Sequence, residues 1–298
     1  MNVIPNVYGY KTECENVPIN YLPQCQPQQP GFEYIMKQRP VSEAPGYGVT
    51  RKLADKVAVI TGGDSGIGRA VAYAFAKEGA DIAIIYYNEH VDAAESKARV
   101  EQLGRRCLLI AGNIGDEAFC RHAAEQTVRV FGRIDILVNN AAVQFFQKRI
   151  EDISSEQLEI TFRINVFGMF YLTKAALPHM RPGSTIINTS SATARTGYEE
   201  LIDYSATKGA INTFTRSLAT SLISRGIRVN AVSPGTTWTP LVSSSFPPEA
   251  YASVGYSNPI KRNAQPVELA GAYVYLASND SSFVVGENIN VNGGEIYV

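Results

Sequence analysis

The chain has 298 residues, of which 45% are apolar, and its formal net charge is −1. This length is enough for one large α/β domain or two small ones, and the apolar fraction is normal for a globular protein with a sizeable core. The near-zero charge gives no support for binding to nucleic acid or to an anionic membrane surface. The chain contains no apolar run of about 18 residues, so a membrane-spanning helix is not expected.

The cysteine pattern bears on metal binding and on compartment. The four cysteines, Cys14, Cys25, Cys107 and Cys120, form no CxxC pair and show no zinc-ligand spacing. Residues 1–30 lack the apolar centre of a signal peptide. Reduced cysteines in a chain of this size and type fit a cytoplasmic protein, so we expect that location and no metal site.

Residues 1–50 form an N-terminal extension whose composition differs from the rest, being rich in Pro, Gln, Asn and Tyr. Proline fixes φ and removes an N–H donor, so regular structure is not expected here. A disordered tail is one interpretation. The apolar side chains of Phe32, Tyr34, Ile35 and Met36 favour another, in which residues 32–40 lie against the domain or a neighbouring subunit.

From Lys56 onward, short β-branched runs alternate with longer helical stretches, which predicts a single α/β domain over residues 51–298. The expected strands are residues 57–61, 81–86, 107–111, 136–139, 185–189, 228–233 and 288–291. The helical stretches include residues 68–78, 116–131, 155–179, 204–224 and 266–277. Because the strands are apolar on both faces, helices should cover both sides of a parallel sheet. We expect a doubly wound, seven-stranded Rossmann sheet with strand order 3-2-1-4-5-6-7.

A glycine-rich turn lies between the first expected strand and the first expected helix, in the sequence T-G-G-D-S-G-I-G from Thr61 to Gly68. Glycines permit a tight turn and a close approach of a pyrophosphate to the backbone, and the helix N-terminus supplies free N–H groups. A purely structural turn is the alternative, but the position after the first strand favours a dinucleotide site. Its candidate residues are Gly62, Asp64, Ser65, Gly66, Ile67 and Gly68.

Four motifs in this order resemble those of the classical short-chain dehydrogenase/reductase family. The turn has the spacing T-G-x-x-x-G-x-G. Residues 139–142, Asn-Asn-Ala-Ala, resemble the family's N-N-A-G with Ala142 in place of glycine, and Tyr204 to Lys208 resembles Y-x-x-x-K. Pro234-Gly235 resembles the loop after the sixth strand. The resemblance runs from about residue 52 to the C-terminus. The Gln-Pro-Gly-Phe-Glu sequence at 29–33 resembles an extension in one bacterial subgroup.

The resemblance implies an oxidoreductase that uses NAD or NADP and acts on the CH–OH group of a small alcohol or on the matching carbonyl compound. It also implies a homo-oligomer, expected to be a homotetramer, built on the helices that contain Asn165 and Tyr204. Residues 293–298 are expected to reach a neighbouring subunit.

The end of the second strand decides between the two cofactors. An Asp there binds the ribose hydroxyls of NAD, and a nearby Arg accommodates the 2′-phosphate of NADP. Tyr86 and Tyr87 occupy those positions, with Asn88 beside them, so neither diagnostic residue is present. Asp64 occupies a place where NADP users of the family often carry a basic residue, and its charge would repel a 2′-phosphate. We expect NAD, with NADP as the alternative.

The resemblance assigns further residues to the cofactor. Asn113 matches an Asp that often touches adenine, and Ile114 is expected to pack beside it. Asn139 and Ala141 are expected to line the ribose. Thr237 and Thr239, after Pro234 and Gly235, match the loop that holds the nicotinamide carboxamide, although an ordinary polar loop is the alternative.

Tyr204 and Lys208 are four residues apart on an expected helix and therefore share one face. Hydride transfer to a carbonyl leaves an alkoxide that needs a proton. A free tyrosine has a pKa of about 10. A cationic lysine beside it stabilises the phenolate and lowers that pKa. The spacing therefore predicts Tyr204 as the acid and base and Lys208 as the group that tunes it.

Two further catalytic residues follow from the resemblance. Ser191, at the end of the fifth expected strand and thirteen residues before Tyr204, matches the family's catalytic serine, with Ser190 as its competitor. Its hydroxyl can share the charge that develops on the substrate oxygen. Asn165 matches the family's asparagine, a poor helix former, and is expected to hold a water that relays protons to Lys208.

The candidate substrate residues are Gln144, Phe145, Thr193, Tyr198 and Glu199, together with residues 238–256 beginning at Trp238. That long Pro/Ser-rich segment is typical of a substrate lid. Two other functions compete with a dehydrogenase. A cofactor-binding sensor or scaffold would not turn over substrate, and a lyase or epimerase would use the cofactor only transiently.

Overall fold

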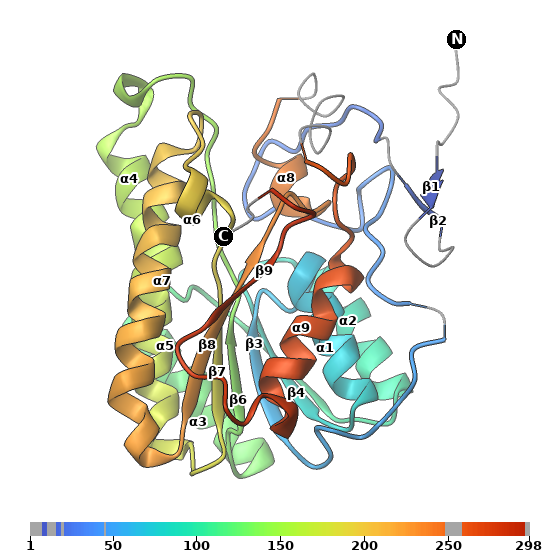
Figure 1. The fold of residues 1–298 in the computed structure, drawn as a ribbon, viewed down its shortest axis with the longest axis vertical. Helices are drawn as coiled ribbons and strands as arrows, with labels where there is room; N and C mark the ends of the chain where they lie inside the picture. Colours follow the sequence, from blue (N-terminus) through green and yellow to red (C-terminus); the bar gives the residue numbers. More distant parts are fainter. Residues whose placement is uncertain (1–7, 11–15, 19–20, 45, 248–257, 296–298) are drawn as a thin grey trace.

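The computed structural model describes residues 8–10, 16–18, 21–44, 46–247 and 258–295, and helices flank both faces of its central sheet (Figure 1). Within these residues the sheet has seven strands in the order β5-β4-β3-β6-β7-β8-β9, and every neighbouring pair is parallel. The predicted fold class and strand order are confirmed. The winding direction reverses between β3 and β6, where a crevice forms beyond the carboxyl ends of the strands.

The strands match their predicted ranges, with β8 one residue longer. They are β3 (Val57–Thr61), β4 (Asp81–Tyr86), β5 (Cys107–Ala111), β6 (Ile136–Asn139), β7 (Thr185–Thr189), β8 (Arg228–Pro234) and β9 (Asn288–Val291). The helices are α1 (Gly66–Lys77), α2 (His90–Gln102), α3 (Glu117–Phe131), α4 (Ser155–Phe162), α5 (Gly168–Ala176), α6 (Thr193–Thr196), α7 (Ile202–Leu222), α8 (Pro240–Ser243) and α9 (Pro266–Ala277). Short helical turns are η1 (Ile150–Asp152), η2 (Arg163–Phe167), η3 (Leu177–His179), η4 (Ile223–Arg225) and η6 (Asn279–Ser281).

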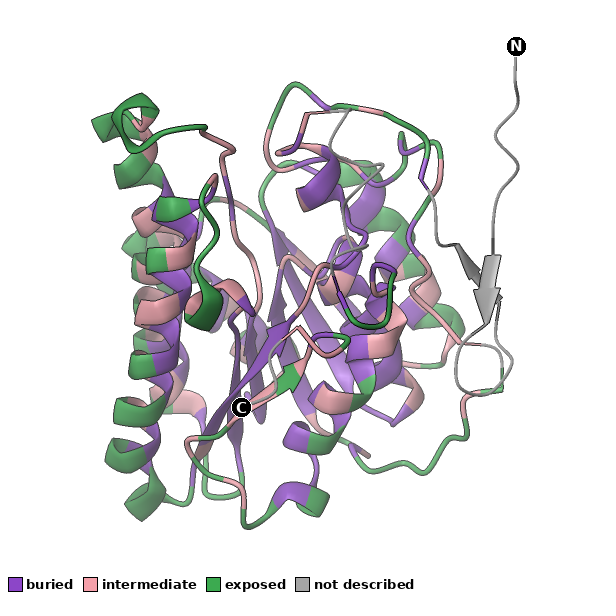
Figure 2. Cartoon of the chain, turned by 45° about the horizontal axis from the view of Figure 1, so that its top comes forward, coloured by how far each residue is buried: buried purple, intermediate pink, exposed green. Residues whose placement is uncertain are grey.

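The hydrophobic core lies in two layers, one on each face of the sheet. Ala58 and Ile60 of β3 pack with side chains of α1 and α9, whereas Val59 between them packs with side chains of α3, α5 and α7. This alternation is the period of two that a strand imposes on its side chains. Figure 2 shows the buried strands between helices whose outer faces are exposed. Helices therefore cover both faces of the sheet, and the edge formed by the carboxyl ends of its strands stays open.

The stretch predicted as one helix over residues 155–179 is divided, which corrects that expectation. A π-helical segment, η2, separates α4 from α5, and the last turn, η3, is a 3₁₀ helix. Asn165 lies in η2, where its side chain bonds to the backbone of Val143 instead of facing solvent. π-Helical segments are often found at functional sites. Here the segment places Asn165 where its side chain fixes the loop after β6 at the crevice.

The N-terminal extension contains regular structure, contrary to expectation. Strands β1 (Tyr8–Tyr10) and β2 (Asn16–Pro18) pair antiparallel through three residues each. Pro18 ends its strand, a position where its missing N–H is tolerated. Residues 21–44 then run along the domain (Figure 1), with backbone bonds from Gln26 N to Ser243 O and from Val267 N to Val41 O. The expected contact of residues 32–40 with the domain is present.

Three cysteines, Cys25, Cys107 and Cys120, are free thiols, and Cys14 lies outside the described residues. Within the described part of the chain, no cluster of three or more His, Cys, Asp or Glu side chains has the arrangement of a metal site. The helices described here also lack the combination of length and apolar character that a membrane crossing requires.

Candidate functional site

A cleft of about 530 Å³ lies at the carboxyl edge of the sheet, across the point where the strand order reverses. It collects residues that follow β3, β4, β5, β6, β7 and β8, so segments far apart in the chain meet there. The predicted cofactor residues that line it are Gly62, Asp64, Ser65, Gly66, Ile67, Tyr86, Tyr87, Asn113, Ile114, Ala141, Tyr204, Lys208, Pro234, Gly235, Thr237 and Thr239. The cleft thus unites most of the residues that the motifs indicated.

The glycine turn brings α1 against the end of β3. Gly62 and Gly66 have φ angles of +65° and +50°, which favour glycine. A Cβ on Gly68 would lie 2.0 Å from the carbonyl oxygen of Gly62, so no other residue fits there without moving the backbone. Gly68 itself does not line the cleft. It allows the helix N-terminus to reach the crevice, a packing role rather than the direct contact that was expected.

Asn139, expected to line the ribose, does not line the cleft, whereas its neighbour Asn140, which was given no role, does. Asn139 is buried behind the cleft, where its amide donates to Asn188 Oδ1 at 2.9 Å and to Thr173 Oγ1 at 3.3 Å. Asn140 lines the cleft instead, and its amide donates to the Thr61 carbonyl at 3.0 Å. The register of β6 decides this, because its last residue still faces the core while the next lies beyond the strand.

An acidic pair lies beside the end of β4. Asp64 is 3% exposed, and burial, with a further contribution from the charge of Glu89, raises the pKa of its carboxyl. Glu89 lines the same cleft and accepts hydrogen bonds from the backbone N–H groups of Tyr87 and Asn88 at 3.0 and 2.9 Å. Asn88 does not line the cleft. The sequence analysis missed Glu89 because it lies three residues beyond the position where the family motif places an acid.

Ser191, Tyr204 and Lys208 converge at the other end of the cleft, where α7 crosses the end of β7. Lys208 is 2% exposed, and its Nζ donates to the Thr189 carbonyl at 2.9 Å and lies 5.3 Å from the centroid of the Tyr204 ring. Ser191 Oγ accepts hydrogen bonds from the N–H and the hydroxyl of Thr193 at 3.2 and 3.0 Å. Ser190 donates its hydroxyl to the carbonyl of Lys208 at 3.2 Å, and is thus held against α7.

Burial affects the protonation of both side chains. It raises the pKa of Tyr204 to about 12, with the Ser191 hydrogen bond acting in the opposite direction, and it lowers the pKa of Lys208 to about 7. The expected depression of the tyrosine pKa by a cationic lysine stays a prediction. The physical reason for both effects of burial is desolvation, which disfavours the phenolate and the ammonium alike when both are enclosed. Tyr204 is protonated at neutral pH.

Asn165 does not line the cleft, although it bonds to Thr207, the residue before Lys208 on α7. Its Oδ1 accepts from Val143 N at 2.8 Å, and its Nδ2 donates to Val143 O at 2.9 Å and to Thr207 Oγ1 at 3.2 Å. Both amide hydrogens thus have protein partners. The expected water relay stays a prediction, whereas the contacts that are present hold the loop after β6 against α7.

The substrate candidates divide into two groups. Gln144, Phe145, Thr193 and Tyr198 line the cleft together with Ser191, whereas Glu199 and Trp238 do not. Trp238 is 1% exposed; its ring stacks on Tyr21 at a centroid distance of 4.0 Å, and its Nε1 donates to the Gln38 carbonyl at 2.8 Å. Tyr21 and Gln38 both belong to the N-terminal extension. The Trp238 side chain, which was expected in the pocket, is therefore covered by the extension. Residues 248–256 of the expected lid lie outside the described residues.

Several lining residues were not named individually as site residues by the sequence analysis. They are Gln29, Pro30, Gly31, Leu241, Val242, Phe246 and Glu295. Glu295 is half-buried, burial raises the pKa of its carboxyl, and one of its oxygens has no hydrogen-bond partner among the described residues. The apolar members follow β8, inside the segment that was expected to form the lid. The first three belong to the N-terminal extension, which composition alone could not place in the cleft.

Comparison with known proteins gives a consistent picture. The family model for enoyl-(acyl carrier protein) reductase matches residues 62–295. An uncharacterized oxidoreductase of Bacillus subtilis, YhxC, is 59% identical over 92% of this chain and 95% of its own length. The glucose and ribitol dehydrogenase of Daucus carota is 48% identical, with coverage of 93% and 97%. The chloroplastic NADPH-dependent aldehyde reductase 1 of Arabidopsis thaliana is 45% identical, with coverage of 92% and 97%.

Solved structures share the fold, and two of them contain a nicotinamide cofactor. A short-chain dehydrogenase from Burkholderia cenocepacia in complex with NADP has a TM-score of 0.77 and 31% identity, and covers 82% of this chain and 99% of its own. A 3-ketoacyl-(acyl-carrier-protein) reductase from Brucella melitensis complexed with NADH has a TM-score of 0.75, 31% identity and coverage of 82% and 99%. Sheet order, motifs and these similarities agree, and the chain belongs to the short-chain dehydrogenase/reductase family of nicotinamide-dependent oxidoreductases.

Proposed function

We propose that this protein transfers hydride between NAD and a small alcohol or carbonyl compound, with Tyr204 as the acid and base. The observation that carries the proposal is the convergence of Ser191, Tyr204 and Lys208 at one end of a cleft whose other end is the glycine turn. A sensor or scaffold that only binds the cofactor would not require this group. The names of two relatives, glucose and ribitol dehydrogenase and aldehyde reductase, support the same chemistry on CH–OH and carbonyl groups.

The residues of the cleft fit a dinucleotide. Gly62, Gly66 and Gly68 leave the backbone open beside the N-terminus of α1, where a pyrophosphate is favoured. Asn113 and Ile114 would hold the adenine, and Thr237 and Thr239 the nicotinamide carboxamide. When bound, the nicotinamide ring supplies or accepts the hydride. The chain's own residues then bind the substrate, orient it and move its proton.

The Tyr204 hydroxyl, which is protonated at neutral pH, is the proposed proton donor. A carbonyl oxygen that gains an electron pair becomes an alkoxide, which takes the proton of the Tyr204 hydroxyl while the Ser191 hydroxyl donates a hydrogen bond to it. Tyr204 is left as a phenolate in a buried site. The ammonium form of Lys208, whose Nζ lies 5.3 Å from the centroid of the Tyr204 ring and whose pKa is about 7, would balance the new charge. The reverse sequence would serve alcohol oxidation.

The proposed role of Tyr204 can be tested by removing its hydroxyl. In Tyr204→Phe we expect turnover to be lost while the Kd for NADH stays within about twofold of wild type, because the ring remains and only the hydroxyl group is missing. Turnover should be measured with a panel of sugars, polyols, aldehydes and diketones, and binding by calorimetry. Tyr275→Phe, at a half-exposed position of α9, is the matched control. A near-normal rate in Tyr204→Phe would refute the role. Tight binding without turnover in wild type would favour the sensor.

The lysine should leave a signature in stability. Between about pH 7 and the ordinary lysine pKa of about 10.4, the unfolded chain binds a proton at Lys208 that the folded chain does not, so the free energy of unfolding rises with pH. Below that window both states are protonated and this contribution is flat. The stability of wild type minus that of Lys208→Met should grow by about 1.4 kcal/mol per pH unit. Urea denaturation at pH 6 to 9 measures it.

The control for this titration is Lys97→Met, which removes a 41%-exposed lysine paired with Glu101. Its stability difference from wild type should show no such rise above pH 7. If the Lys208→Met difference is also independent of pH, the ammonium group is not the buried titrating group described here.

The choice of NAD is supported by the two carboxylates beside β4. Asp64 and Glu89 line the cleft at the glycine turn and the end of the second strand. Burial raises the pKa of both carboxyls, so the pair carries only part of its full negative charge, and a 2′-phosphate would meet that remaining charge. The relatives include one named as NADPH-dependent and a structure with NADH, so the family accommodates both cofactors.

We expect wild type to prefer NADH, and Asp64→Asn to lower the ratio of kcat/KM for NADH over NADPH by about tenfold, or about 1.4 kcal/mol. The reason is the loss of charge repulsion without a change in side-chain size. Asp152→Asn, which removes a surface carboxylate paired with Arg149, is the control. A wild-type preference for NADPH would overturn the assignment to NAD.

We also propose a homotetramer in the cytoplasm. Free thiols support that compartment. Exposed apolar side chains on α4, η2 and α5, namely Leu158, Ile160, Phe167 and Phe170, support a subunit contact. Light scattering should give four times the chain mass of 32.5 kDa. Phe170→Glu should dissociate the assembly, whereas Val91→Glu, at a somewhat more exposed position of α2, should not. A monomeric wild type would contradict the proposal.

A further inference from the structure

Residues 26–33 of the N-terminal extension, called the strap below, lie across the mouth of the cleft. Gln29, Pro30 and Gly31 line the cleft beside residues of the glycine turn and of the substrate end. The solved relatives described above match 82% of this chain but 99% of their own, so a part comparable in length to the extension has no counterpart in them. The strap therefore adds a wall to the family's site.

At the substrate end, the strap holds the loop after β6. The side-chain amide of Gln29 donates to the carbonyl of Gln144 and accepts from its N–H at 3.0 Å, so both backbone groups of Gln144 are bonded to one side chain. Gln144 lines the cleft, and Asn165 holds Val143 before it in the same two-point manner. Gln29 therefore fixes the position of a substrate-lining residue.

A second contact anchors the strap to the segment after β8. Gln26 N donates to Ser243 O at 3.0 Å, and Gln26 Nε2 donates to Ser243 Oγ at 3.1 Å. The same amide closes the strap by bonding both the N–H and the carbonyl of Phe32. A Cβ on Gly31 would lie 2.6 Å from the Pro240 carbonyl oxygen, so the strap packs directly on α8. These contacts leave the strap little freedom to shift.

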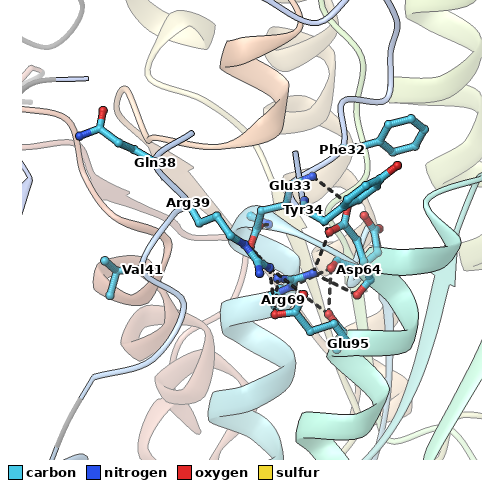
Figure 3. Close-up of polar contacts among 12 residues, drawn as sticks. Phe32, Glu33, Tyr34, Gln38, Arg39, Val41, Asp64, Arg69 and Glu95 are labelled. Carbon is cyan, nitrogen blue, oxygen red and sulfur yellow. Dashed lines mark hydrogen bonds and ion pairs between the residues drawn. The ribbon is translucent and has the colours of Figure 1, made fainter. Parts of the chain in front are cut away.

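At the cofactor end, Glu33 caps the helix that carries the glycine turn (Figure 3). Ser65, the N-cap residue of α1, makes no capping bond with its own side chain. Glu33, 1% exposed, takes that place: its Oε2 accepts from Gly66 N at 2.7 Å. A carboxylate is favourable at a helix N-terminus because it meets unpaired N–H groups. One orphan donor of α1 is thus satisfied from the extension.

Arg69 balances the buried charge and ties Glu33 to the turn. Its Nη1 lies 2.6 Å from Glu33 Oε1, its Nη2 3.3 Å from Asp92 Oδ1, and its Nε donates to the Asp64 carbonyl at 2.8 Å. Asp92 in turn accepts from the backbone N–H groups of Glu33 and Tyr34 at 2.8 and 2.9 Å. A buried ion pair with additional hydrogen bonds strongly opposes the loss of one partner. The strap and the glycine turn form one hydrogen-bonded unit.

We propose that the strap positions both halves of the site, Glu33 setting the glycine turn for the pyrophosphate of the cofactor and Gln29 setting the Gln144 wall for the substrate. This inference rests on the proposed oxidoreductase function. Glu33 and Gln29 are positioning residues, since they act through Gly66 and Gln144. A strap that only stabilised the fold would affect cofactor and substrate constants together, whereas two separate contacts should affect them separately.

The experiment compares four variants of the full chain. Glu33→Ala should raise the Kd for NADH and for ADP-ribose about tenfold, with the KM for the carbonyl substrate within about twofold. Gln29→Ala should change the other constant: it should raise the KM for the carbonyl substrate about tenfold and leave the Kd for NADH within about twofold of wild type. Glu43→Ala is the control, because Glu43 joins the same extension to Lys77 and Arg99 at 2.8 and 2.7 Å but does not line the cleft. It should change neither constant.

Glu33→Gln guards against a folding defect, because its amide oxygen can still accept from Gly66 N. It should recover most of the NADH affinity that Glu33→Ala loses. Equal changes in both constants for Glu33→Ala and Gln29→Ala, or wild-type affinity for NADH in Glu33→Ala, would overturn the proposal for the strap. Calorimetry of NADH binding needs no turnover, so wild-type chain that binds neither NADH nor NADPH would instead overturn the function on which the proposal rests.

Discussion

The close approach of α1 to the end of β3 is the constraint on which the site depends. With no side chain at Gly68, the helix lies against the Gly62 carbonyl, where a single added carbon would be 2.0 Å away. This contact brings the helix N-terminus to the crevice at the reversal of strand order, and it presents the Gly66 N–H to Glu33. The residues proposed to bind the cofactor, the pair of Asp64 and Glu89, and the strap are all arranged around that one packing contact.

Burial controls the charges of the site. Tyr204 and Lys208 are both enclosed, and desolvation keeps the phenol protonated and brings the lysine pKa close to neutrality. The Asp64 carboxyl is shifted toward its neutral form for the same reason. Burial thus favours the neutral forms of Tyr204, Lys208 and Asp64, and a bound group or a proton transfer would change that preference. In the proposed reaction, the pair of Tyr204 and Lys208 would change its protonation with the chemistry instead of being permanently ionised.

The extension changes the view of how this cleft is built. Its side chains cover Trp238, cap α1 and bond the loop after β6, so it takes part in both ends of the site. Sequence relatives such as YhxC match 92% of the chain, whereas the solved structures described here match 82%. The additional segment therefore accompanies particular members of the family, and it supplies contacts that the shared domain lacks.

Local sequence determined the seven strands, the glycine turn and the spacing of Tyr204 and Lys208, because each depends on periodicity or on spacing within one short segment. The parallel order was expected from the alternation of strands and helices along the whole chain. The tertiary structure decided which neighbour of a motif faces the cleft, as for Asn140 in place of Asn139, since the end of β6 depends on its pairing partners. It also decided the π-helical turn at Asn165, the burial of Trp238 and the place of Glu33. Each of these rests on contacts between residues far apart in the chain, and no local pattern records such contacts.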